Sequence, residues 1–147
     1  MERQSPPRSI NLGATCGCYS DVRGVDRNLV TLGFPEELGR LADPSVAVKA
    51  LSSAAKCWNP EWGGIFSSEL VRYDEFDSRI PVVDWMIYVP EIIESVPPPS
   101  SVLQLEGLGS VIIVQPCPPR RDDPEQLKVV DRIKQIIGVS DGNPRSI

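Results

Sequence analysis

The sequence contains no histidine among its 147 residues. This absence excludes a Ser-His or Cys-His nucleophile pair, a histidine-ligated zinc ion and an imidazole general base. The chain also lacks the glycine-rich phosphate-binding loops, the G-x-S-x-G nucleophile motif and the spacing of an EF-hand. We therefore predict no catalytic residue and favour a protein that is not an enzyme.

Long hydrophobic runs are also missing. The N-terminal residues MERQSPPRS contain no apolar segment of the kind that a signal peptide needs. The most apolar stretch, at residues 79–90, is much shorter than the roughly 20 residues that span a bilayer. We expect a cytoplasmic protein that makes no contact with a membrane.

Cysteine is scarce, with four residues in the chain. In a reducing compartment these are better explained as small buried apolar side chains than as disulfides. Cys16 and Cys18 form a C-x-C pair, whereas zinc sites usually combine C-x-x-C pairs. We therefore predict no metal site and no cofactor.

Basic residues are few in the middle of the chain. Residues 57–110 hold nine carboxylates against two arginines, whereas each flank carries a net charge of +1. An acidic field of this kind attracts a basic partner and repels nucleic acid. On charge alone, a solvated surface that keeps the protein in solution is the simpler interpretation. The carboxylates of this acidic middle block are Glu61, Glu69, Asp74, Glu75, Asp77, Asp84, Glu91, Glu94 and Glu106.

The acidic middle block surrounds the stretch RIPVVDWMIYVP at residues 79–90, which predicts a central strand. Alternation of side chains places Trp85 and Ile87 on one face and Asp84 and Tyr88 on the other. Because Asp84 is the only strongly polar residue among the alternating side chains, we expect both faces to be largely covered. Trp85 and Tyr88 are predicted to be structural residues.

Three helical patterns and two hairpins flank this strand. Residues 10–19 and 29–34 predict strands of a hairpin, residues 35–43 a short helix, residues 45–58 a longer helix and residues 64–71 a further strand. The predicted buried stripe of the longer helix is Val46, Ala50, Leu51, Ala54, Cys57 and Trp58.

The C-terminal third predicts a hairpin followed by a helix. Glycines at 107 and 109 suit the turn of the hairpin. Asp123 is a good N-cap, Pro124 suits the first helical position, and Gln126 completes a capping-box pattern. Gly138 ends the helix. Its predicted buried stripe is Leu127, Val130, Ile133 and Ile137.

These elements predict a single α+β domain at residues 10–138, between a flexible N-terminal arm at 1–9 and a flexible tail at 139–147. We expect one mainly antiparallel sheet of about five or six strands, with the two main helices packed on one face.

Two tryptophans stand four residues apart around a proline turn, in the sequence CWNPEWGG. Tryptophan is highly buried on average, so Trp58 is predicted to be a structural core residue. Exposed aromatic residues are enriched at the centres of protein interfaces, and we therefore choose Trp62 and Tyr73 as candidate contacts with a partner.

The carboxylates at positions 74, 75 and 77 are the densest in the chain, and with Glu61 or Glu69 they could bind a divalent cation through oxygen. A carboxylate metal hydrolase is therefore one alternative function. It is disfavoured because a nuclease normally holds phosphates with basic residues, and these carboxylates are surrounded by further acids.

Several short motifs, taken in order, resemble one known family. They are C-G-x-Y at 16–19, N-x-V-x-L at 28–32, W-x-P-x-W-G at 58–63, V-x-W-M-x-Y at 83–88 and a proline-capped C-terminal helix. This order resembles the immunity protein 52 family over residues 10–138. The position of Asp84 is usually glycine in the family pattern, so a contact there is expected to differ.

The resemblance implies a bacterial protein that neutralises a polymorphic toxin, here one with a nuclease domain of the restriction-endonuclease fold. Charge and resemblance agree on docking of an acidic surface against a basic toxin. We expect no direct binding to nucleic acid. The alternative function is an orphan interaction or scaffold domain that could form a homodimer through an exposed sheet edge. The predicted partner-binding residues are Glu61, Trp62, Tyr73, Asp74, Glu75, Asp77, Asp84, Glu91 and Glu94.

Overall fold

The computed structural model describes residues 11–15, 29–33, 39–67, 80–120 and 122–139. These residues form two antiparallel sheets, two α-helices and a short 3-10 helix, η1 (Gly39–Ala42). The α+β class is therefore confirmed. None of the helices in these residues combines the length and the apolar character needed to cross a bilayer.

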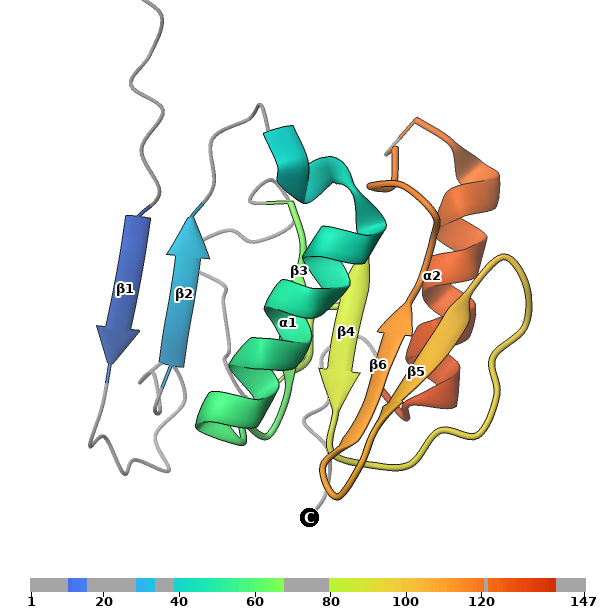
Figure 1. The fold of residues 1–147 in the computed structure, drawn as a ribbon. Coiled ribbons are helices and arrows are strands. Elements are labelled where there is room, and N and C mark those ends of the chain that lie inside the picture. The colour runs from blue at the N-terminus through green and yellow to red at the C-terminus, as the bar shows by residue number, and fades with distance from the viewer. Residues whose placement is uncertain (1–10, 16–28, 34–38, 68–79, 121, 140–147) are drawn as a thin grey trace, which may run out of the picture.

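The central sheet has four antiparallel strands in the order β3-β4-β6-β5 (Figure 1). The predicted hairpin at the glycine turn is confirmed, since β5 and β6 pair directly. The strands are β3 (Gly63–Ile65), β4 (Met86–Val89), β5 (Ser101–Leu105) and β6 (Gly109–Ile113).

The predicted N-terminal hairpin is also present, as β1 (Asn11–Thr15) paired with β2 (Leu29–Gly33). Within the described residues these two strands form a sheet of their own and do not pair with the central one. The prediction of one sheet with five or six strands is therefore wrong: the strands exist, but they are divided between two sheets.

Strand β4 is buried on both faces, as the sequence predicted, and all four of its residues are inaccessible to solvent. Ile87 and Val89 belong to one apolar cluster, whereas Met86 and Tyr88 belong to another. Trp85 departs from the predicted alternation, because it packs in the same cluster as Met86. The strand is also shorter than predicted, since the chain bends at 84–85 before it begins.

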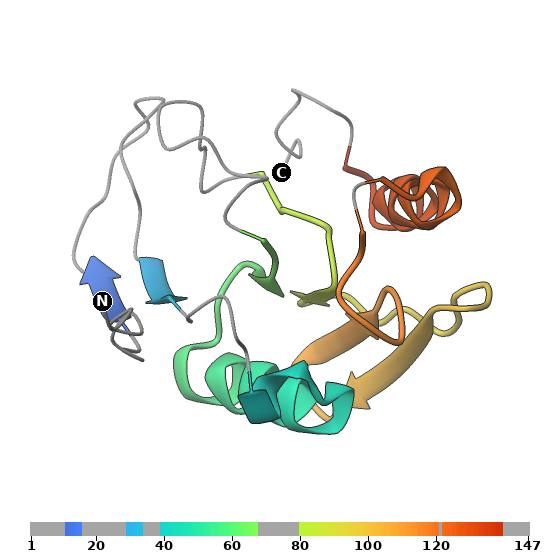
Figure 2. The ribbon, with the colours of Figure 1, turned by 90° about the horizontal axis from the view of Figure 1, so that it is seen from above.

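The two helices cover opposite faces of the central sheet (Figure 2). Helix α1 (Pro44–Trp58) packs against the face that carries Met86, and α2 (Pro124–Ile136) packs against the face that carries Ile87. The prediction that both helices lie on one face is wrong. Because β4 is apolar on both sides, each side needs a covering layer.

Helix α1 begins where the sequence predicted but buries a different face. The Asp43 carboxylate caps it by accepting the Ser45 N–H at 2.8 Å, and Asn59 ends it in the left-handed conformation (φ 43°). The buried residues are Ala47, Leu51, Ser52 and Ala55, so the predicted stripe is wrong except at Leu51. Small residues face the sheet and let the helix approach it closely.

Helix α2 is closed at both ends by local hydrogen bonds. Asp123 accepts the N–H groups of Glu125 and Gln126, but the Gln126 side chain accepts the Arg120 N–H and does not complete the capping box. At the other end Gly138 (φ 71°) is left-handed, and the Val139 N–H reaches back to the Lys134 carbonyl at 2.9 Å.

The apolar stripe of α2 is confirmed at three of its four predicted positions. Val130, Ile133 and Ile137 are buried, but Leu127 is exposed and its predicted burial is wrong. Val139, which we had assigned to the flexible tail, packs in the same cluster as Ile133. The packed region of the chain therefore extends at least to this residue.

Candidate functional site

The register of the central sheet brings three chain segments together at one end. Gly63 pairs with Tyr88, Val89 pairs with Ser110, and Leu105 pairs with Gly109. The start of β3, the end of β4 and the β5–β6 turn therefore lie at the same end of the sheet, which is the lower end in Figure 1. The loops that leave this end are residues 59–62, 90–94 and 106–108.

These three loops carry four exposed carboxylates and no lysine or arginine. We call the surface formed by these loops and by Trp58, the last residue of α1, the acidic end. It contains three of the predicted partner-binding residues, Glu61, Glu91 and Glu94. The fourth carboxylate, Glu106, was counted in the acidic middle block but not chosen as a site residue. Its place in the β5–β6 turn follows directly from the predicted hairpin.

A buried serine holds the loop that follows β4. The Ser110 hydroxyl is inaccessible to solvent and accepts the N–H of Ile93 at 2.8 Å. Its single proton can be donated to the Glu91 carbonyl at 2.9 Å or to Gln104 Oε1 at 3.1 Å. Gln104 Nε2 in turn donates to the Ile93 carbonyl. Backbone groups on both sides of Ile92 are therefore fixed to the sheet.

Two further features bring the loops close to the sheet. The buried Tyr88 hydroxyl donates to the Leu108 carbonyl at 3.1 Å. Burial, and secondarily the Glu91 carboxylate, raise the pKa of Tyr88 above its usual value. At Gly109 (φ 149°), a Cβ atom would collide with the Val89 carbonyl and the Pro90 backbone. Only glycine permits this close approach of β6 to the end of β4.

The acidic end also exposes two large apolar side chains. Trp58 is 55% exposed and lies at the end of α1, one residue before the first loop, and Ile92 is 65% exposed in the second loop. The prediction that Trp58 is a core residue is wrong, because α1 faces the sheet with its alanines. Ile92 was missed. The adjacent apolar pair Ile92-Ile93 in a polar loop was the available signal, since neighbouring extended residues point in opposite directions.

Comparison with protein-family models matches residues 4–140 to immunity protein 52. The chain belongs to the immunity protein 52 family. No curated protein and no solved structure gives a significant match. Membership confirms the family that the sequence motifs suggested. It supports an immunity function, in which the protein binds a toxin partner protein, and suggests a role other than catalysis.

The other predicted partner-binding residues of this immunity protein lie in different environments or outside the described residues. Asp84 is buried, and its carboxylate accepts the Ser67 N–H at 2.9 Å, so it is not a surface group. Trp62 is half-buried, with its ring 6.5 Å from that of Phe66. Four predicted residues lie outside the part of the chain that the structure describes, and these are Tyr73, Asp74, Glu75 and Asp77.

The other structural residues predicted for the family member, Trp85 and Tyr88, are buried. Among the described residues, no three cysteines or carboxylates are grouped so that they could hold a metal ion. The carboxylate group proposed for the metal hydrolase, at positions 74, 75 and 77, is outside those residues, so that alternative stays a prediction.

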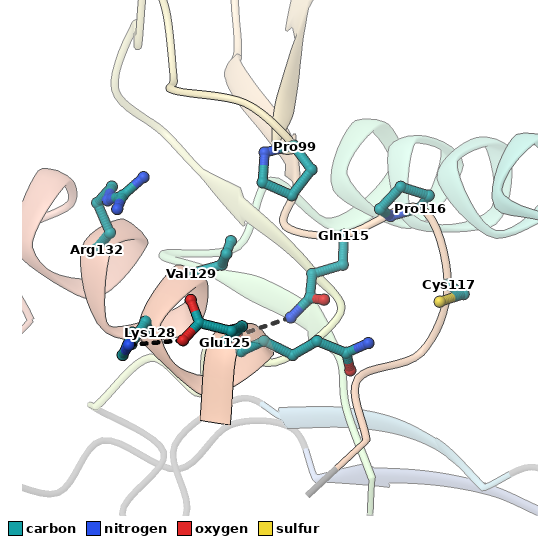
Figure 3. Close-up of a pocket in the computed structure, with 9 residues that line it drawn as sticks. Pro99, Gln115, Pro116, Cys117, Glu125, Lys128, Val129 and Arg132 are labelled. Carbon is teal, nitrogen blue, oxygen red and sulfur yellow. Dashed lines mark hydrogen bonds and ion pairs between the residues drawn. The ribbon is translucent and has the colours of Figure 1, made fainter. Parts of the chain in front are cut away.

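An open depression of about 470 Å³ lies between α2 and the segment after β6, at the opposite end of the sheet (Figure 3). The Gln115 side chain is tied to α2 by a 3.0 Å hydrogen bond to the Gln126 carbonyl, and Lys128 is paired with Glu125 at 2.6 Å. Arg132 and the exposed thiol of Cys117 also line it. The polar groups that line the depression do not converge on a common point. The depression is therefore a weaker candidate for a functional site than the acidic end.

Proposed function

We propose that this immunity protein binds a cognate nuclease toxin through its acidic end and thereby neutralises it. The observation that supports this proposal is that Glu61, Glu91, Glu94 and Glu106 lie on three loops that leave the same end of the central sheet, and that none of these loops contains a basic residue. A nuclease must present a basic surface to its substrate, and this surface is the natural complement of the acidic end. That the toxin is a nuclease rests on the family resemblance found in the motifs.

Inhibition on this proposal is by occupation. The acidic end covers the basic surface of the toxin, and its negative charge repels the phosphates of nucleic acid from the same place. Long-range attraction raises the association rate more than it raises affinity. The segment with Tyr73, Asp74, Glu75 and Asp77 remains a predicted extension of this docking surface. Cytoplasmic location is part of the proposal, because a nuclease toxin acts on the nucleic acid inside the cell.

Charge reversal tests the proposal with a matched control. The test variant is Glu61→Lys/Glu94→Lys/Glu106→Lys, and the control is Asp122→Lys/Glu125→Lys/Asp131→Lys on and before α2. Each of the three reversals adds two charges, so both variants move from a net charge of −5 to +1. The control residues form surface ion pairs with Arg120, Lys128 and the half-buried Lys134, and such pairs contribute about 0–1 kcal/mol each to stability.

Binding to the inactivated toxin domain encoded beside the gene is measured by surface plasmon resonance at two salt concentrations. We expect the test variant to associate about tenfold or more slowly at low salt and to lose most of its salt dependence. The control variant should retain more of the wild-type association rate and more of its dependence on salt. Equal losses in the two variants would mean that the acidic end has no special role in docking.

A second candidate, a scaffold that self-associates through its sheet edge, has one observation in its favour. Among the described strands, β5 is at the edge of the central sheet, and its Leu103 is an exposed apolar residue. Light scattering on the purified protein separates the candidates. A stable dimer without affinity for the co-encoded toxin would favour the scaffold.

A further inference from the structure

The two most exposed large apolar side chains of the described residues both lie at the acidic end. Ile92 and Trp58 are more exposed than Leu103, Leu127 and Ile136, the other large apolar residues with substantial exposure. Single exposed apolar side chains, scattered over a protein surface, are common and need no explanation. These two instead lie at the same end of the sheet, beside the start of β3 and after the end of β4, which are paired strands, and the loops of that end carry the four carboxylates.

Ile92 is held in its exposed position. The buried Ser110 hydroxyl accepts the N–H after Ile92 at 2.8 Å, and the carbonyl before Ile92 is one of the two acceptors within reach of the hydroxyl proton, at 2.9 Å. Ile93 points inward and packs on the cluster that contains Val89. Ser110 and Gln104 thus fix the backbone on both sides of Ile92 without covering its side chain. An anchor that is fixed before binding loses little conformational freedom when it docks.

We infer that Ile92 is a preorganised apolar anchor and that Trp58 is a second anchor. Both side chains insert into an apolar pocket within the basic surface of the toxin. The inference rests on the proposed function and adds the side chains that give the complex its lifetime. Interface hot spots are typically desolvated apolar or aromatic residues at the centre, surrounded by a polar rim. The carboxylates of the three loops supply such a rim.

Charge complementarity identifies the occupant. A second copy of this chain docked symmetrically through the same end would place Glu61, Glu91 and Glu106 of one copy against those of the other. Like charges in such an interface oppose association. A basic partner gains from the same carboxylates. The apolar anchors therefore fit a basic toxin surface and do not fit self-association.

Truncation of the anchors tests the inference. Ile92→Ala and Trp58→Ala are compared with Leu127→Ala, which removes an exposed apolar side chain from α2 (43% exposed). We expect each anchor variant to dissociate from the inactivated toxin about tenfold or more rapidly, with an unchanged dependence of the association rate on salt. Leu127→Ala should dissociate at the wild-type rate. Wild-type dissociation rates for both anchor variants would overturn the inference.

A double-mutant cycle tests whether Ser110 acts by positioning Ile92. Ser110→Ala removes the bonds to the loop and keeps every surface charge. We expect it to raise the dissociation rate about threefold or more when Ile92 is present, and to have little further effect in the Ile92→Ala background. Purely additive effects would mean that Ser110 acts on the complex independently of Ile92, and no effect of Ser110→Ala alone would mean that it acts only on folding; either result would overturn the positioning role.

The outcomes for the two proposals are distinguishable. A wild-type protein that fails to bind the toxin would overturn both. Weakened association after charge reversal, together with wild-type dissociation rates in the anchor variants, would keep the proposed function and overturn the anchors. Rapid dissociation of the anchor variants, together with equal losses in the two charge variants, would support the anchors and overturn acidic docking.

Discussion

Replacement of Trp85 by alanine is the sharpest test of how the fold is held together. The Trp85 side chain is 2% exposed and packs in the cluster that includes Leu51 of α1 and Met86 of β4. Its indole N–H donates to the Gln115 carbonyl at 3.1 Å, and the Gln115 side chain donates to the Gln126 carbonyl in the first turn of α2. Trp85 therefore connects the two layers that lie on opposite faces of the sheet.

The expected cost has two parts. Removal of a buried tryptophan side chain costs about 3–5 kcal/mol, of which the cavity is a substantial share. The substitution also leaves the buried Gln115 carbonyl without its donor, and an unsatisfied buried polar group costs about 1–3 kcal/mol. The first range already includes part of the second, so we expect a loss of about 4–5 kcal/mol. A domain with a stability of about 5–15 kcal/mol would be near its limit.

Urea unfolding followed by far-ultraviolet circular dichroism measures this loss. Trp85→Phe serves as the control, since it keeps most of the apolar body while it removes the N–H donor and a small part of the ring, for an expected loss of about 1–3 kcal/mol. The packing argument would be refuted by a Trp85→Ala variant that unfolds within about 1 kcal/mol of the wild type at an unchanged denaturant slope.

Two further substitutions probe the residues that shape the acidic end from within. Gly109→Ala should lower the free energy of unfolding by about 2–5 kcal/mol, because the position has a positive φ and the added Cβ would clash with the Val89 carbonyl. Gly138→Ala is the control, since its Cβ would meet no neighbour, and it should cost about 1–2 kcal/mol. Similar losses for the two variants in urea unfolding would contradict the clash. Because the pKa of Tyr88 is raised, the folded state keeps the phenol proton when the unfolded chain releases it near pH 10. Stability should therefore fall as the pH rises above about 10. Tyr88→Phe should show a shallower fall of the thermal unfolding midpoint over the same pH range. An equally steep fall in Tyr88→Phe would show that other groups dominate.

The elements of the fold that sequence predicted well are those whose signals are local. Asp123, Pro124 and Gly138 mark the ends of α2, and their hydrogen bonds lie within a few residues of each other along the chain. Glycines at 107 and 109 likewise mark the β5–β6 turn. Both elements were therefore placed correctly without knowledge of the rest of the chain.

The errors concern how elements meet over long sequence distances. Nothing local indicates that β2 pairs with β1 alone and leaves β3 as a separate partner of β4. The placement of both helices on one face, however, was avoidable. A central strand with apolar residues on both sides requires a cover on both sides, and the sequence of residues 79–90 already had that property. The predicted burial of the strand was right, and the inference drawn from it for the helices was not.

The candidate site was predictable in its charge but not in its composition. Counting carboxylates finds the acidic middle block, and the pairing of β3, β4 and β6 then selects Glu61, Glu91, Glu94 and Glu106 from it. The same count cannot separate these from Asp84, which is buried and bonded to the Ser67 N–H. Trp58 was misplaced because several faces of α1 carry apolar residues, and periodicity does not distinguish among them.

The architecture separates the residues that form the fold from those proposed to bind the toxin, and side-chain hydrogen bonds connect the two groups. The carboxylates and the two apolar anchors lie on loops or at a helix end, whereas β4 and β6 beneath them are almost entirely buried. Substitutions in these loops can therefore change charge and shape with little cost to the core. Ser110 connects them at the loop that follows β4, because it is buried in the sheet and bonded to that loop. A change of specificity that moved the loop would need a compensating change at or beside this serine, whereas a change confined to the side chains of Glu91, Ile92 or Glu94 would not.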